Sequence, residues 1–302
     1  MERWWIYQQE RFPIVKHGML IAVFAAAAVC YSILLRNGTG TGVPVGAIAI
    51  SFISLFLCFL QLRIADEFKD FADDARYRPY RPVPRGLVTL QELGILAIAV
   101  AAIQLGLAVS VGLKLVLLLA LVWGYMGLMS REFFVRDWLK ARPIMYLLSH
   151  AVIMPLLALY AAACDWVSAT GVLPPGLGWF LLLSFLISLA IELGRKLRAP
   201  QDEETGVETY SALWGMQRAA IAWLTVIWLV AIAALLAAAQ VQLIAPTALM
   251  LLPLLTLAMV VVWRFLARPS AYWAKGFEVA TGLWTLGVYL TVGVIPLWFR
   301  NL

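Results

Sequence analysis

Four acidic residues at helical spacing are the strongest chemical signal in this sequence. Asp66, Asp70 and Asp74 follow one another at intervals of four, and Glu67 joins the same helical face at i, i+3 and i+7. In one continuous helix, neighbouring carboxylates lie about 6 Å apart along the axis. Like charges on one stripe destabilise a bare helix, so we expect a cation over them. Magnesium fits, since it takes one or two carboxylates and completes its shell with waters and substrate phosphates.

A rigid basic turn follows these acids. The segment 78–86 reads Arg-Pro-Tyr-Arg-Pro-Val-Pro-Arg-Gly. Arginine donors bind phosphate well, so acids for a metal beside arginines for a phosphate indicate a diphosphate site. We predict Asp66, Glu67, Asp70 and Asp74 as metal ligands, with Asp70 and Asp74 catalytic and Arg81 bound to the diphosphate. The alternative is a solvated helix end whose acids are offset by Lys69, Arg76 and Arg78.

The elements that must position these residues are membrane helices. Of 302 residues, 63% are hydrophobic and 13% charged, against about half and a quarter in soluble domains. This composition excludes a soluble enzyme, a disordered protein and a nucleic-acid-binding domain. A helix that crosses a bilayer needs about 20 apolar residues. We predict nine spans, at residues 17–36, 44–64, 90–111, 113–130, 144–164, 175–193, 219–241, 245–266 and 276–298.

Basic residues are divided unequally between alternate connections. Of the 23 Lys and Arg, 20 fall on the side of the N-terminus, and Arg36, Lys114 and Arg300 fall on the other. The positive-inside rule then predicts a cytoplasmic N-terminus and an outer C-terminus, in a bacterial-type inner (plasma) membrane. Of the 17 acids, 16 share the cytoplasmic side and Asp165 does not. We expect one all-α domain over residues 1–302, with nine transmembrane helices bundled around a cytoplasm-facing cavity.

The first acidic motif resembles that of a known family. Asp66-Glu67-x-x-Asp70-x-x-x-Asp74, with Arg81-Pro82-x-Pro84-x-Gly86 seven residues on, is similar to the first aspartate-rich motif of the UbiA superfamily of intramembrane prenyltransferases. That pattern is Asn-Asp-x-x-Asp-x-x-x-Asp with an Arg-Pro turn at the same offset. Asp66 replaces the Asn and Glu67 the first Asp, and both keep an oxygen ligand. Nine spans and motif loops after spans 2 and 6, at about 66–89 and 192–218, also match.

The second motif of the family is altered here. Gly206-Val207-Glu208-Thr209 is present, with Asp202 four residues before the glycine, as the family has it. Counting back in the family register places Arg198 and Arg195 where acids belong. An echo of the Gly-x-x-Thr, residues 86–89, follows the first cluster, so the two halves look like a diverged internal repeat.

This inversion of charge changes what the second motif is expected to bind. Asp202 and Glu192 are the metal-ligand candidates, with Glu203 and Glu204 as substitutes. Arg195, Lys196 and Arg198 are expected to contact the diphosphate, in place of metal charge. The alternative is that these three only anchor span 6 at the cytoplasmic face.

Two further polar regions have candidate roles. The family often has a phosphate-binding basic residue after span 4, which here points to Arg131, also taken as catalytic, and then to Lys140. Pairs such as Arg131 with Glu132 are the structural alternative. His150 lies early in span 5, where a lone histidine is more often a hydrogen bond between helices than a functional group.

The resemblance implies a magnesium-dependent transferase. It would move a prenyl group from an isoprenyl diphosphate to a hydrophobic or aromatic acceptor, such as a quinone precursor or a membrane lipid, with no nucleic-acid partner. The altered second motif leaves open a terpene cyclase, a phosphosugar transferase or a catalytically inactive relative. A transporter is a further alternative, although transporter sites usually lie near the midplane and not in cytoplasmic loops.

Overall fold

The computed structural model describes residues 2–36, 44–204 and 206–300, with side chains up to residue 297. Over these residues the protein is helical and has no strand. Nine helices in this part are long and apolar enough to cross a membrane, which confirms the predicted number. The predicted connection Asn37–Pro44 lies, apart from Pro44, outside the described residues.

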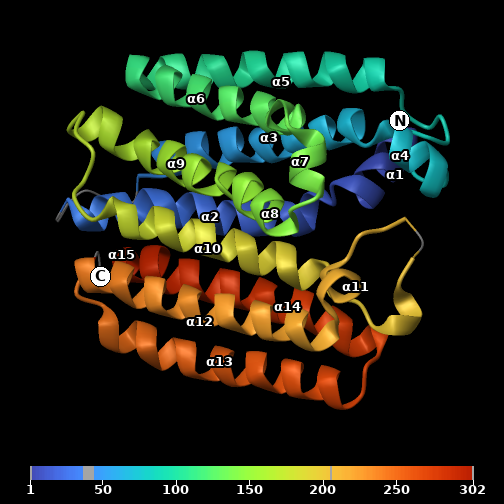
Figure 1. Ribbon diagram of the computed structural model, residues 1–302. Helices are drawn as coiled ribbons and strands as arrows, with labels where there is room; N and C mark the ends of the chain where they lie inside the picture. The colour runs from blue at the N-terminus through green and yellow to red at the C-terminus, as the bar shows by residue number, and fades with distance from the viewer. Residues whose placement is uncertain (1, 37–43, 205, 301–302) are drawn as a thin grey trace.

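The spans form one bundle, drawn in Figure 1. Spans 1–4 are helices α2 (Ile14–Leu35), α3 (Val45–Lys69), α5 (Leu90–Val111) and α6 (Leu113–Ser130). Span 5 is α8 (Pro143–Ala151) with α9 (Ile153–Ala169), and span 6 is α10 (Leu177–Arg195). Spans 7 and 8 are α12 (Met216–Gln240) and α13 (Ile244–Ala267). Span 9 is α14 (Ala271–Tyr289), continued through a wide π turn at Leu290–Val294 into α15 (Ile295–Arg300).

Small residues allow the central helices to pack closely. Runs of buried alanine lie on α2, α9 and α12, and small side chains are typical of contacts between membrane helices. The closest approach is at Gly293, where an added Cβ would lie 2.6 Å from the backbone of Ala27. By contrast, α5 and α13 lie on opposite edges of the bundle (Figure 1), and few of their residues are buried.

A proline divides span 5 into two helices. Pro155 has no N–H to donate to the carbonyl of Ala151, and its ring crowds the preceding turn. The Ser188 hydroxyl, from α10, lies 3.4 Å from that freed carbonyl oxygen and 2.7 Å from the Phe185 carbonyl oxygen, so its single proton has two acceptors within reach. The segment α8 is thereby set apart as a short helix at the charged end of the bundle.

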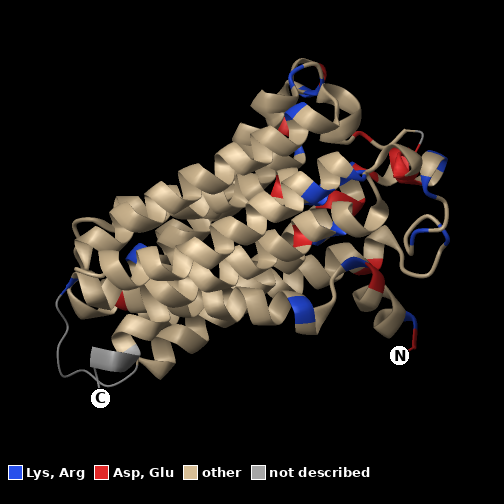
Figure 2. Cartoon of the chain, turned by 90° about the horizontal axis from the view of Figure 1, so that it is seen from below, with Lys and Arg blue, Asp and Glu red and all other residues tan. Residues whose placement is uncertain are grey.

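Charged residues gather at one end of the bundle, which we call the charged end (Figure 2). The N-terminal helix α1 (Glu2–Arg11) lies there, and the C-terminus lies at the other end (Figures 1 and 2). At that other end Arg36 pairs with Asp165 at 2.6 Å, and Lys114 donates to the Gly171 carbonyl at 2.6 Å. The side chain of Arg300 is outside the described part. Two of the four exceptions to the charge rule, Arg36 and Asp165, thus neutralise each other.

Candidate functional site

The first acidic cluster spans a break between two helices. Helix α3 ends at Lys69, the chain turns at Asp70, and α4 covers Phe71–Tyr77. The Asp70 N–H still donates to the Asp66 carbonyl at 2.9 Å, and the Asp74 N–H donates to the Asp70 carbonyl at 2.8 Å. The expected single helix is therefore bent, but its acids remain on successive turns.

Arginines hold two of the four acids. Glu67 and Asp74 are each 2% exposed. The Arg11 Nε donates to Glu67, and another Arg11 nitrogen lies 3.9 Å from Asp74. Arg81 contacts Asp74 at 2.5 Å and Arg78 contacts it at 3.2 Å. The cation expected over the stripe is thus partly arginine, and Arg11 comes from a segment that the motif did not indicate.

Asp66 and Asp70 are the two more accessible acids. The Asp66 side chain is 44% exposed and lies 3.5 Å from Arg63. Asp70 is half-buried, and no described basic group lies within 4.0 Å of its carboxylate. Burial raises the pKa of Asp70; the neighbouring Lys69 lowers it, and the charges of Asp66 and Asp74 raise it further. A carboxylate in this state gains from a nearby cation.

Two carboxylates fit the way magnesium binds. In the described part of the chain, no three His, Cys, Asp or Glu side chains converge as a metal site. Magnesium does not require such a cage, because it takes one or two carboxylates and otherwise waters and phosphate oxygens. Asp66 and Asp70 suit that role as they stand, whereas Glu67 and Asp74 would first have to leave their arginines.

Lys69 links this cluster to the loop after span 4. Its ammonium donates to the Tyr146 hydroxyl at 3.0 Å and lies 4.0 Å from Glu132. Glu132 is buried and also lies 3.4 Å from Arg136. The motif pattern did not indicate Lys69 or Tyr146, although Lys69 stands within it.

The two predicted phosphate-binding residues of the loop after span 4, Arg131 and Lys140, are exposed at the surface. No acid lies within 4.0 Å of Arg131 among the described residues. The alternative pair of Arg131 with Glu132 does not form, since Glu132 contacts Lys69 and Arg136. Lys140 lies 3.7 Å from Asp73, an exposed acid outside the predicted set.

A narrow cavity lies beside Asp66 and Lys69. Its volume is about 20 Å³, and its walls come from α3, α6 and α8. Met126 and Met129 supply apolar surface and His150 supplies an imidazole. The cavity is therefore lined by charge on one side and by apolar side chains on the other.

The charges of the second region partly neutralise one another. Glu192 contacts Arg195 at 2.7 Å and Lys196 at 2.9 Å. Burial, and then the negative charge of Glu192, raises the pKa of Tyr210, which is in α11 (Tyr210–Trp214). Glu192 and Arg195 lie in the last turn of α10, which packs against α8, the helix whose His150 lines the cavity beside Asp66.

The Gly-x-x-Thr segments have the same local structure in both halves. Gly86 and Gly206 have φ of +78° and +80°, a conformation that favours glycine. Three residues later Thr89 caps α5 by accepting the Glu92 N–H at 3.2 Å, and Thr209 caps α11 by accepting the Ala212 N–H at 3.1 Å. Each motif therefore turns the chain and starts a helix, a local likeness that agrees with the predicted internal repeat.

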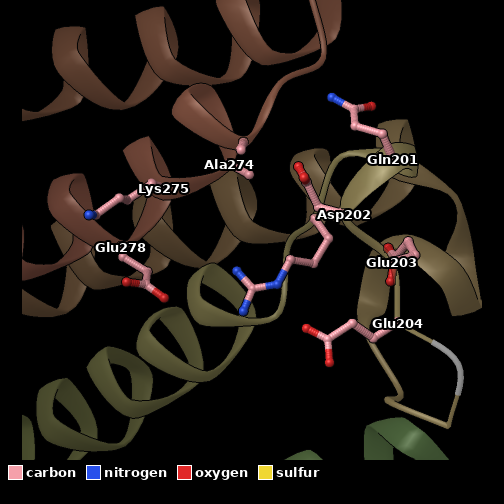
Figure 3. A pocket seen from close by; sticks show the side chains of 9 residues that line it. Gln201, Asp202, Glu203, Glu204, Ala274, Lys275 and Glu278 are labelled. Carbon is pink, nitrogen blue, oxygen red and sulfur yellow. The ribbon is translucent and has the colours of Figure 1, made fainter. Parts of the chain in front are cut away.

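Asp202 lies elsewhere. With Arg198, Glu203 and Glu204 it lines a second cavity of about 500 Å³, which does not include Asp66 or Asp70. Figure 3 shows Lys275 and Glu278, from α14, across this cavity from the loop. Glu203 accepts the Thr209 hydroxyl at 2.6 Å. Arg198 and Asp202 are therefore separated from the pair of Glu192 and Arg195.

Several solved structures share this fold. An apo UbiA homologue from Aeropyrum pernix K1 has a TM-score of 0.68 at 14% identity, covering 91% of this chain and 96% of that one. A structure of a digeranylgeranylglyceryl phosphate synthase has a TM-score of 0.59 at 12% identity, covering 97% and 99%. An Archaeoglobus fulgidus UbiA homologue bound to GPP and Mg²⁺ has a TM-score of 0.53 at 12% identity, covering 92% and 98%. These likenesses show the fold.

Sequence comparison supplies the family. No curated protein matches the chain by sequence. The model of the UbiA prenyltransferase family matches residues 38–281, which include both motif loops, spans 2–8 and the first part of span 9. The resemblance seen in the first motif is thereby confirmed, and this integral membrane protein belongs to the UbiA prenyltransferase family.

Proposed function

We propose that the protein is a magnesium-dependent prenyltransferase that acts at the cytoplasmic face of its membrane. It transfers a prenyl group from an isoprenyl diphosphate to a hydrophobic or aromatic acceptor, a quinone precursor or a lipid. The observation that carries this proposal is the pair Asp66 and Asp70, accessible carboxylates beside basic groups in a chain of this family. A homologue with this fold was solved with GPP and Mg²⁺.

The acids of the first cluster would hold the metal. Asp66 and Asp70 are the first ligands, and Glu67 and Asp74 lie on neighbouring turns. Bound magnesium would neutralise diphosphate charge as the allylic carbon–oxygen bond ionises. Of the second-region acids, Glu192 is the better candidate, because its helix α10 packs against α8 beside this site, whereas Asp202 lines the other cavity.

Basic side chains would bind the diphosphate oxygens. Arg195 and Lys196 are the best placed, because they hold Glu192 at the end of α10, which packs against the helix that lines the Asp66 cavity. Arg81 lies on Asp74 and would reach the diphosphate from there. Arg131, Lys140 and Arg198 are weaker candidates, since they lie at the exposed loop or in the second cavity.

Diphosphate release tests the proposal. The purified protein would receive geranyl, farnesyl or geranylgeranyl diphosphate, each with and without magnesium and a membrane lipid extract. Asp70→Asn is the variant and Asp73→Asn the matched control, because Asp73 is three residues away and exposed. We expect release that needs magnesium and Asp70 and survives loss of Asp73.

The extract then separates the reactions. Release that depends on the extract supports transfer, and release without it points to cyclisation or hydrolysis. The proposal fails if folded protein releases no diphosphate from any of the three donors.

A further inference from the structure

The tautomer of a histidine beside the first acidic cluster can be assigned from its contacts. His150 is in α8 and lines the narrow cavity with Asp66 and Lys69. Its Nδ1 lies 2.9 Å from the carbonyl oxygen of Tyr146, one turn earlier. A carbonyl only accepts, so Nδ1 carries the proton and donates it. In the neutral ring the other nitrogen, Nε2, therefore holds a free lone pair.

That lone pair is buried without a partner. Among the described residues, no donor lies within hydrogen-bond distance of the His150 Nε2, which is shielded from solvent. Nearby Lys69 donates to the Tyr146 hydroxyl instead. Buried polar atoms nearly always have a partner, and an exception calls for an explanation. A ligand that donates a hydrogen bond would supply one.

The imidazole is also held in a fixed orientation. It stacks on the Tyr146 ring at 3.9 Å with an interplanar angle of 16°, and the Phe133 ring meets it edge-on at 5.9 Å and 83°. Tyr125 packs against the other side of Phe133, with centroids 5.5 Å apart.

The backbone that holds Phe133 is strained. Glu132, Phe133 and Phe134 have φ of 48°, 54° and 61°. Residues other than glycine rarely adopt a positive φ. Such backbone strain persists where the surrounding structure imposes it, often at functional sites. The strained turn brings Phe133 to the imidazole and Glu132 towards Lys69.

We infer that His150 is an acceptor-binding residue. Its Nε2 accepts a hydrogen bond from a hydroxyl or amine of the molecule that receives the prenyl group. This inference rests on the proposed function and adds the chemistry of the acceptor. Leu62, Met126 and Met129 line the same cavity, so the body of that acceptor is apolar. The cavity of about 20 Å³ has room for a group the size of a hydroxyl.

A second histidine provides a matched control. The His17 Nδ1 lies 3.1 Å from the Pro13 carbonyl oxygen, and the ring stacks on Phe12 at 4.9 Å. It therefore has the local bonding of His150, but it does not line the narrow cavity.

The test measures donor and acceptor steps separately. His150→Phe keeps a flat ring and removes the lone pair, whereas His150→Gln keeps an acceptor oxygen. Each variant, with His17→Phe, would receive geranylgeranyl diphosphate, magnesium and a membrane lipid extract. The readouts are prenyl transfer into the extract and the rise in Tm caused by the donor and magnesium without extract.

We expect His150→Phe to lose at least tenfold in transfer while the donor still raises Tm. His150→Gln should remain within about threefold of the starting protein, and His17→Phe should match it. Transfer at full rate by His150→Phe would overturn the inference and leave the proposed function standing. So would a folded His150→Gln that is as impaired as the phenylalanine variant. If the unmodified protein neither releases diphosphate nor responds to the donor, the proposed function fails first.

Discussion

The two motif loops share a glycine turn and a threonine cap, but the segments before the turn differ in charge. Residues 66–74 carry five acids and one base, whereas residues 192–198 carry one acid and three bases. In both loops, a membrane helix ends at the charged end, a glycine with positive φ turns the chain, and a threonine three residues later caps the next helix. In the first loop the acids of residues 66–74 have one base, Lys69, among them. Glu67 is paired with Arg11, which is distant in the sequence. In the second loop Glu192 is paired with Arg195 and Lys196 of its own turn.

This difference shows that a turn and its binding chemistry can diverge separately. The Gly-x-x-Thr segment needs only backbone conformation and one cap, so it survives changes in the charges before it. A carboxylate that is closely paired with a cation gains less from a metal, because its charge is already neutralised. Two loops of one repeat can therefore share their backbone while one keeps open acids and the other supplies bases.

The largest expected effect is on metal-dependent activity. Asp70→Asn should lower diphosphate release about 100-fold or more, the scale seen when one group that stabilises transition-state charge is removed. Asp202→Asn should change it less than about threefold, because Asp202 lines the other cavity. Release rates at saturating donor would measure both. An equal loss in the two variants would show that the second loop is also a metal site.

Loss of Arg11 should chiefly affect stability. Arg11→Ala leaves Glu67 buried without its partner, and breaking a buried pair costs about 3–5 kcal/mol. Thermal unfolding in detergent would show a lowered Tm, partly restored in Arg11→Ala/Glu67→Ala. Arg195→Ala is the control, since its side chain is 51% exposed. A Tm unchanged by Arg11→Ala would mean that the first loop does not depend on this distant arginine.

The bases of the second loop should differ in donor binding. Arg195→Ala should raise the KM for the donor about tenfold, equivalent to about 1.4 kcal/mol, because Arg195 is a proposed diphosphate ligand on α10, which packs against the helix that lines the Asp66 cavity. Arg198→Ala should leave it within about threefold, since Arg198 lines the second cavity. Steady-state kinetics at fixed magnesium would measure both values. Equal effects would contradict the separation of these two arginines.

The smallest expected effect is on the two helix caps. Thr89→Ala and Thr209→Ala should each cost about 1 kcal/mol, the usual value of such a cap. Thr89→Ser and Thr209→Ser, which keep the hydroxyl, should cost less. Denaturation midpoints of the four variants would show whether the threonine cap stabilises α5 and α11 to the same extent. If only one alanine variant lost stability, the two caps would share their geometry but not their contribution to the free energy of unfolding.

Much of the fold follows from local sequence. Nine apolar tracts predict nine helices, because each segment must satisfy its own backbone in lipid. The break in span 5 has a local cause in Pro155, yet an apolar tract alone does not show it. The predicted stripe at 66–74 was also partly wrong, since the chain bends at Asp70.

The candidate site was only partly predictable. The motif indicated Asp66 and Asp70, and the structure leaves both accessible. It also indicated Glu67 and Asp74, which the structure places on arginines. No motif indicated Arg11 or Tyr146, and Glu132 was paired with Arg131 in place of Lys69 and Arg136. Nothing in a single sequence marks which distant residues will meet.

The sequence by itself determined the membrane class, the helices, the end of the bundle that carries the charge, and the family motif. These depend on composition, period and residue spacing, which act over a few turns of chain. Tertiary structure decided which acids are paired and which remain open. Arg11 and Glu67 are 56 residues apart, and Lys69 and Tyr146 are 77 apart. Such contacts exist only once the helices have packed, since packing alone sets the distances on which charge and hydrogen bonding depend.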